Sequence, residues 1–227
     1  MTWYDDSILL LNEAKEQLND LKSIEFEAVR NEDLLNKAKP KIKNFLENCR
    51  SPLDYIVNDA VNTFKLKGKS KRIYFPITYN NKYFESTIFY SFEDIKNTLP
   101  ELYSFFEKYQ CFYGNDQSTG YLSHLVNNNK HQELSTQENS LVHHVESMKI
   151  GGNFFSNCTF ANCDIPVQIG DAKYDFIDNV PVDTKHVSRR TIIFKELDLD
   201  VIPLLENILK AVSNIVDDAS LILGRYD

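Results

Sequence analysis

Arg50 and Asp54 form the first candidate functional pair in the chain. They are four residues apart in a stretch with helical spacing of apolar residues, so they share a helix face and can form an ion pair. Both would lie beside the apolar stripe, where a partly desolvated charge needs a partner or serves a site. An internal ion pair is the favoured interpretation over a catalytic one, because buried polar groups are nearly always paired.

A second polar set lies between residues 122 and 134, where His124, Asn127 and His131 follow a 3-4 spacing. If this helix meets the middle of the Arg50 helix, a histidine could act as a general base and an arginine could stabilise a developing negative charge. The candidate catalytic residues on this hypothesis are Arg50, Lys130 and His131. The candidate polar pocket around them consists of Asp54, Tyr55, His124 and Asn127.

Residues 65–72 read KLKGKSKR and hold five basic side chains and no acidic one. The candidate RNA-binding residues in this basic loop are Lys67, Lys69, Lys71 and Arg72. A solvated loop is the favoured alternative, because short charge runs are usually only exposed. The aromatic residues at 102–113 could stack on bases, but their helical spacing is more typical of a core.

Composition limits the function classes. The chain has 227 residues, is 42% hydrophobic and 26% charged, and carries a net charge of −8. These values predict a soluble globular protein of one large or two small domains and disfavour non-specific coating of nucleic acid. No apolar run reaches the roughly 18 residues of a membrane span, and the acidic N-terminus lacks a basic signal region. We therefore expect a cytoplasmic protein that does not use a membrane.

Cofactor and metal chemistry has little support in the sequence. No glycine-rich phosphate loop is present, so no cofactor is expected. Cys158 and Cys163 have four residues between them, and His143 and His144 precede them in an order unusual for zinc. Reduced thiols are the simpler interpretation, and we expect no metal site.

The first part of the chain predicts helices. A 3-4 apolar rhythm indicates one helix over 6–30 and a second from Leu35 to Phe64, in which Pro40 and Pro52 should mark a start, a kink or a break. Residues 73–90 are aromatic and β-rich around an Asn-Asn turn, which indicates a hairpin or paired extended segments. Further helices are expected at about 92–98, 100–109 and 119–133.

The second part changes character. Residues 138–197 indicate an antiparallel sheet of four or five strands, best defined at 186–196, and an amphipathic helix follows from residue 201. The predicted fold class is α+β: a helical bundle over 1–134 with an inserted hairpin, then a β-rich segment over 135–227 with a closing helix packed on the bundle. One continuous domain is the alternative to this division.

Three motifs in this order carry a resemblance to a family: RSPLDY at 50–55, FPI at 75–77 and NNNKH at 127–131. They resemble prokaryotic proteins near the HEPN-like helical superfamily, which continue into a β-rich segment and a closing helix. The resemblance implies an up-and-down helical bundle that dimerises. It also implies one of two activities, RNA cleavage in toxins or defence effectors, or binding and scaffolding in inactive members.

The sequence departs from the family at the nuclease motif, and this difference bears on which of the two activities to expect. The HEPN nuclease motif places a histidine after an arginine and four to six intervening residues, but Tyr55, Ile56 and Val57 occupy those positions after Arg50. We therefore favour a non-enzymatic interaction or scaffold module of a bacterial system, with a second copy, a protein or an RNA as partner. The alternative is an RNA-cleaving or RNA-binding component of a phage-defence or toxin–antitoxin system.

Overall fold

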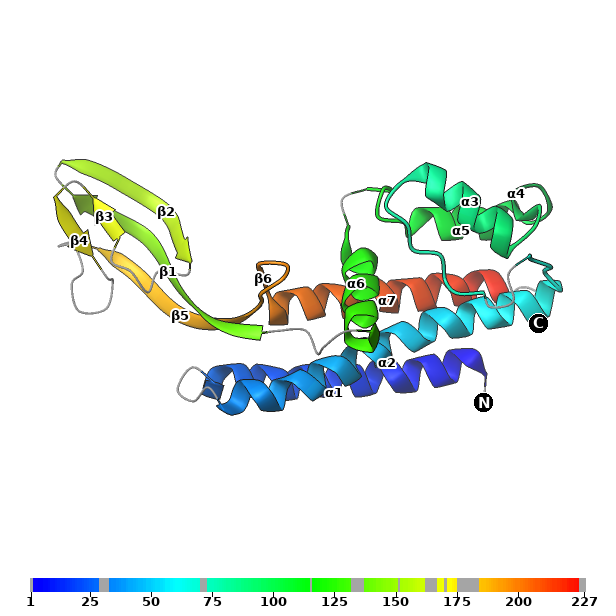
Figure 1. The fold of residues 1–227 in the computed structure, drawn as a ribbon, viewed down its shortest axis with the longest axis horizontal. Helices are drawn as coiled ribbons and strands as arrows, with labels where there is room; N and C mark the ends of the chain where they lie inside the picture. Colours follow the sequence, from blue (N-terminus) through cyan, green and yellow to red (C-terminus); the bar gives the residue numbers. More distant parts are fainter. Residues whose placement is uncertain are drawn as a thin grey trace. The chain divides into compact units, whose positions relative to one another are not determined.

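The structure, a computed structural model, describes residues 2–28, 33–69, 73–114, 116–131, 137–150, 152–161, 167–169, 171–174 and 184–224. Within these ranges the chain forms seven helices and six strands (Figure 1). The predicted α+β class is confirmed. The chain divides into two compact units, the first made of residues 1–22, 37–135 and 202–227 and the second of residues 23–36 and 136–201.

Long helices form the centre of the first unit. They are α1 (Trp3–Ala28), α2 (Asp33–Phe64) and α7 (Val201–Leu223). Late in α1, the Lys22 Nζ lies 2.6 Å from the Glu206 Oε1 near the start of α7. Tyr4 donates a 3.4 Å hydrogen bond to Asp217 near the opposite end of α7, so α1 and α7 run antiparallel. The closing helix therefore belongs to the helical unit.

Helix α2 contains both prolines of the predicted second helix. Two of the alternatives for these prolines, a helix start at Pro40 and a break at Pro52, are wrong, because one helix runs through both positions. Each proline removes a backbone hydrogen bond, but the apolar stripe beside them is fully buried and outweighs that loss. The buried stripe includes Ile42, Phe45, Leu46, Cys49, Leu53 and Ile56.

The hairpin expected within 73–90 is wrong in its second half. Residues 73–80 are extended without a strand partner, and α3 (Asn81–Ser91) follows. The Asn80 side chain accepts the amide N–H of Tyr83, so the Asn-Asn pair caps a helix instead of forming a turn. Phe84 and Ile88, four residues apart, bury the inner face of α3.

An aromatic core joins α3 to the short helix α4 (Ile95–Thr98) and to α5 (Pro100–Lys108). Phe92 stacks on Phe106 with 5.1 Å between ring centroids. The buried Gln110 side chain accepts the Thr78 N–H at 2.9 Å and donates to the Pro76 carbonyl at 2.8 Å, which fixes the extended 73–80 segment on the end of α5. The residues at 102–106 are thus mainly core, as their spacing suggested.

Helix α6 (Ser118–His131) completes the helical unit. At its start, Asp116 accepts the Ser118 N–H at 2.8 Å. Gly120 packs so closely that a Cβ there would lie 2.7 Å from the Cys111 sulfur, so the first turn of α6 is seated on the residues that follow α5. The prediction of a helix at 119–133 is confirmed up to residue 131, and 132–133 lie outside the described residues.

The second unit is an antiparallel sheet with the order β2-β1-β5-β6, beside the separate pair β3-β4. The strands are β1 (Gln137–Ile150), β2 (Asn153–Ala161), β3 (Val167–Ile169), β4 (Ala172–Tyr174), β5 (Lys185–Phe194) and β6 (Leu199–Asp200). The expected sheet and its best strand are confirmed. The Glu25 carboxylate accepts hydrogen bonds from the Thr191 hydroxyl at 2.9 Å and the Ile192 N–H at 3.1 Å, which anchors β5 to the end of α1.

No helix in the described part of the chain combines the length and the apolar character needed to cross a bilayer.

Candidate functional site

The sequence-predicted ion pair is present on α2. Arg50 Nη2 lies 3.2 Å from Asp54 Oδ1, and their side chains are 14% and 30% exposed. Over the residues that the structure describes, neither side chain makes a further hydrogen bond or ion pair. The guanidinium is therefore neutralised by a residue of its own helix, which is the arrangement expected of an internal pair.

Among the described side chains, no hydrogen bond or ion pair joins Tyr55, His124 or Asn127 to this pair. His124 is exposed, and its Nε2 lies 3.1 Å from Asn128 Nδ2 within α6. Asn127 is also exposed. Tyr55 lines a separate groove of about 260 Å³ between α2 and the start of α1. Lys130 and His131 end α6, but their side chains lie outside the described part.

The described half of the basic loop is docked. Lys69 N–H donates to the Tyr90 carbonyl at 2.9 Å, and the Glu93 N–H donates to the Lys67 carbonyl at 3.0 Å. Gly68 between them approaches α3 so closely that a Cβ would lie 2.1 Å from the Ser91 carbonyl oxygen. This segment is thus held on the C-terminal end of α3, unlike a freely solvated loop. Lys71 and Arg72 lie outside the described residues.

Helix α3 presents an aromatic and basic surface, which we call the α3 face. At 100° per residue its members lie opposite the buried Phe84, Ile88 and Ser91. Their side chains are all exposed, and they are Lys82, Tyr83, Ser86, Phe89 and Tyr90. The three rings are 65%, 50% and 55% exposed in chain order. Lys69 from the docked loop extends this face, because its Nζ lies 4.3 Å from the centre of the Phe89 ring.

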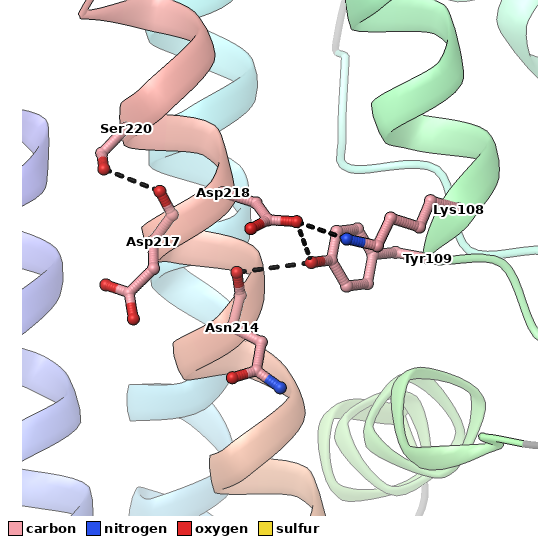
Figure 2. A network of polar contacts seen from close by, with 6 residues as sticks. All are labelled: Lys108, Tyr109, Asn214, Asp217, Asp218 and Ser220. Atoms are coloured by element: carbon pink, nitrogen blue, oxygen red, sulfur yellow. Dashed lines mark hydrogen bonds and ion pairs between the residues drawn. The ribbon is translucent and has the colours of Figure 1, made fainter.

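A polar network joins the end of α5 to α7 elsewhere in the same unit. Figure 2 shows Lys108 and Tyr109 pointing toward Asp218, whose Oδ2 lies 2.6 Å from the Lys108 Nζ and 2.6 Å from the Tyr109 hydroxyl oxygen. Burial, together with the hydrogen bond to Asp218, raises the pKa of Tyr109 to about 12. The hydrogen bond from Lys108 lowers the pKa of Asp218. These three groups satisfy one another, so the network is a cross-link between helices.

A cleft of about 420 Å³ lies beside this network, between the start of α6 and α7. Its lining combines the Asp116 carboxylate and the Lys210 ammonium with the side-chain amides of Gln117, Asn207 and Asn214. Among the residues with described side chains, no group of three or more His, Cys, Asp or Glu side chains could hold a metal ion.

Searches with protein-family models, among curated proteins and among solved structures found no match to this chain. The candidate site is therefore chosen on its own geometry. Among the described residues, the α3 face is a surface where three exposed aromatic rings of one helix lie close to lysines.

Sequence reasoning missed the α3 face because it interpreted residues 82–90 as a strand. A strand would have sent Phe89 and Tyr90 to opposite faces, whereas a helix turns both toward solvent. The signal that could have found the helix is the asparagine at position 80 followed by apolar residues at 84 and 88.

Proposed function

We propose that this chain is a non-enzymatic interaction module, a HEPN-like helical bundle that binds its partner through the α3 face. The observation that carries the proposal is the exposure of Tyr83, Phe89 and Tyr90 on one helix surface. Clustered exposed apolar side chains that rim or contact charged groups are typical of binding surfaces. Aromatic rings contribute large contact areas at low entropic cost, which suits them to this role.

The state of Arg50 supports binding over RNA cleavage. A cation that stabilises a phosphorane must be free to face the substrate, whereas the Arg50 guanidinium is engaged by Asp54 at 3.2 Å. The ordinary role of such an i, i+4 pair is to stabilise its helix by a few tenths of a kcal/mol. On this proposal, the middle of α2 is structural and the function resides on α3.

A cleavage assay tests the non-enzymatic part of the proposal. The purified protein is incubated with total RNA, with and without Mg²⁺, beside Arg50→Ala and His131→Ala. We expect intact RNA in every sample and a slightly lower melting temperature for Arg50→Ala, because it loses its partner Asp54. RNA cleavage by the wild type that disappears in both folded variants would replace the proposal with the ribonuclease alternative.

A co-purification experiment tests the binding part. The tagged wild type is recovered from the cells that make it, and the bound protein and nucleic acid are quantified separately. The face variant is Phe89→Ser with Tyr90→Ser. The matched control is Phe154→Ser with Tyr113→Ser, which removes the same two ring types from exposed positions outside α3. We expect the partner to be lost from the face variant alone. Equal recovery with all three proteins would remove the α3 face from the proposed function.

A further inference from the structure

We propose that the partner of the α3 face is single-stranded nucleic acid, an inference that rests on the proposed function of that face. The bases would stack on Tyr83, Phe89 and Tyr90, and the phosphates would be held by lysines that flank the rings. These lysines are Lys69, whose Nζ lies 4.3 Å from the centre of the Phe89 ring, Lys82 on the face itself, and the exposed Lys67 of the same docked loop as Lys69.

The arrangement of the rings fits stacking. Tyr83 and Tyr90 are seven residues apart, so they lie on the same side of the helix. Lys82 and Phe89 are also seven residues apart and form a second row next to the tyrosines. A rise of about 1.5 Å per residue separates each pair by about 10 Å along the axis. Bases can therefore meet rings at both ends of the face. Base–aromatic stacking tolerates any sequence because every base has a π-face.

Local charge favours a polyanion in spite of the overall charge of −8. Residues 65–94 contain six lysines or arginines and three acidic residues, Glu85, Glu93 and Asp94. The Glu85 carboxylate is already bound, at 2.9 Å by Lys96 Nζ and at 2.7 Å by the Tyr103 hydroxyl. By contrast, neither Lys69 nor Lys82 forms an ion pair with any described residue. Repulsion from more distant acids is screened beyond about 8 Å at physiological salt.

The side-chain types argue against a duplex as the ligand. Reading base edges in a groove requires forked or amide donors such as Arg, Asn and Gln. The α3 face carries hydroxyl, phenyl and ammonium groups instead. Its rings can contact bases only when the bases are unstacked, so an unpaired strand is the ligand that uses both the rings and the lysines.

The test is a titration of the full-length protein into fluorescently labelled 12-nucleotide oligouridine, its oligodeoxythymidine counterpart and a 12-base-pair duplex, followed by anisotropy. The RNA and DNA arms distinguish the two sources of a single strand. We expect at least one of the two single strands to bind about tenfold more tightly than the duplex. The Phe89→Ser, Tyr90→Ser face variant should lose about tenfold or more in affinity, as expected when base stacking is removed. The Phe154→Ser, Tyr113→Ser control should bind like the wild type.

The salt dependence gives a second readout that does not depend on removing rings. Lys67→Gln with Lys69→Gln should lower the slope of log affinity against log salt by about 0.7 for each phosphate that these lysines neutralise. Lys15→Gln with Lys37→Gln, two exposed lysines on α1 and α2, is the control and should leave the slope unchanged. An unchanged slope in the loop variant would show that these lysines do not hold the phosphates.

Three results would overturn this inference. They are no binding of either single strand by the wild type, equal binding of single strand and duplex, and an unchanged affinity in the folded face variant. If the wild type binds no oligonucleotide but co-purifies with a protein in a manner that the face variant abolishes, this inference fails while the proposed function stands. If the face variant retains every partner, both fail together.

Discussion

Two regions of the helical unit are built from the same kinds of residue: the α5–α7 contact and the α3 face. Among the described residues, only the α5–α7 contact also contains an acidic partner for its lysine. In both, a lysine ammonium lies over an aromatic ring, 5.0 Å from the ring centroid for Lys108 and Tyr109 and 4.3 Å for Lys69 and Phe89. The first pair also reaches the Asp218 carboxylate, which accepts from both (Figure 2). The second pair has no carboxylate partner within the described part of the chain.

The presence or absence of a carboxylate explains the different roles of the two lysine–aromatic pairs. With Asp218 present, the charge and the hydroxyl are satisfied within the chain, so the network stabilises the packing of α5 on α7. On the α3 face the cations remain available to an outside anion, and the rings remain exposed. A lysine–aromatic pair is therefore informative about binding only when the chain supplies no acid for it. The predictions below alter one side of this comparison at a time.

Among the substitutions that alter one of the two compared regions, the largest effect on stability is expected for Gly68→Ala. The new Cβ would lie 2.1 Å from the Ser91 carbonyl oxygen, so the loop must move away from α3. We expect the free energy of unfolding, measured with urea, to fall by about 1–3 kcal/mol. Lys67→Ala changes a neighbouring side chain without this clash and should stay within about 0.5 kcal/mol of the wild type. Wild-type stability in Gly68→Ala would mean that the loop is not docked on α3.

A smaller loss is expected for Asp218→Asn, which removes the charge that both Lys108 and Tyr109 use. We expect the free energy of unfolding to fall by about 1–2 kcal/mol at neutral pH. Because the folded pKa of Asp218 lies below its ordinary value of 3.8, the carboxylate stabilises the fold above that pH. The difference from the wild type should therefore shrink as the pH falls below about 4.

Asp217→Asn is the control for this prediction. Its carboxylate is one residue earlier on α7, and among the described residues it accepts a single long hydrogen bond, 3.4 Å from the Tyr4 hydroxyl. A loss in this control as large as in Asp218→Asn would assign the effect to helix charge in general instead of to the network.

Tyr109→Phe should cost less, about 1 kcal/mol, because it removes one hydroxyl and keeps the ring. The sign of its pH dependence is opposite to that of Asp218. Since the pKa of Tyr109 is raised from 10.0 to about 12, the neutral phenol stabilises the fold below pH 10 and this contribution is lost as the pH rises toward 12. Unfolding measured from pH 9 to 12 should show a shallower decline in the variant. Parallel curves would exclude Tyr109 as a source of the alkaline loss.

Local sequence patterns predicted much of the fold and little of the site. Apolar spacing identified α1, α2, α5 and α7, and the burial of Leu53 and Ile56 explains why it succeeded across Pro52. The Arg50–Asp54 contact followed from i, i+4 spacing alone. The bond between Tyr109 and Asp218 joins residues 109 positions apart, and no local pattern encodes such a separation. Helix α3 was missed because aromatic and β-branched residues have strand propensity, which the Asn80 cap and the burial of Phe84 override.

The smallest effect on stability is expected where the effect on binding is largest. Phe89→Ser with Tyr90→Ser removes rings that are 50% and 55% exposed, so little apolar burial is lost. We expect the free energy of unfolding, measured with urea, to fall by about 0.5 kcal/mol or less for each substituted residue. Phe92→Ala, at the next position but one after Tyr90, should instead cost about 3 kcal/mol or more, because Phe92 is fully buried against Phe106. If the face variant were destabilised as strongly as Phe92→Ala, its rings would be part of the core, and the distinction between a completed network and an open binding surface would no longer hold.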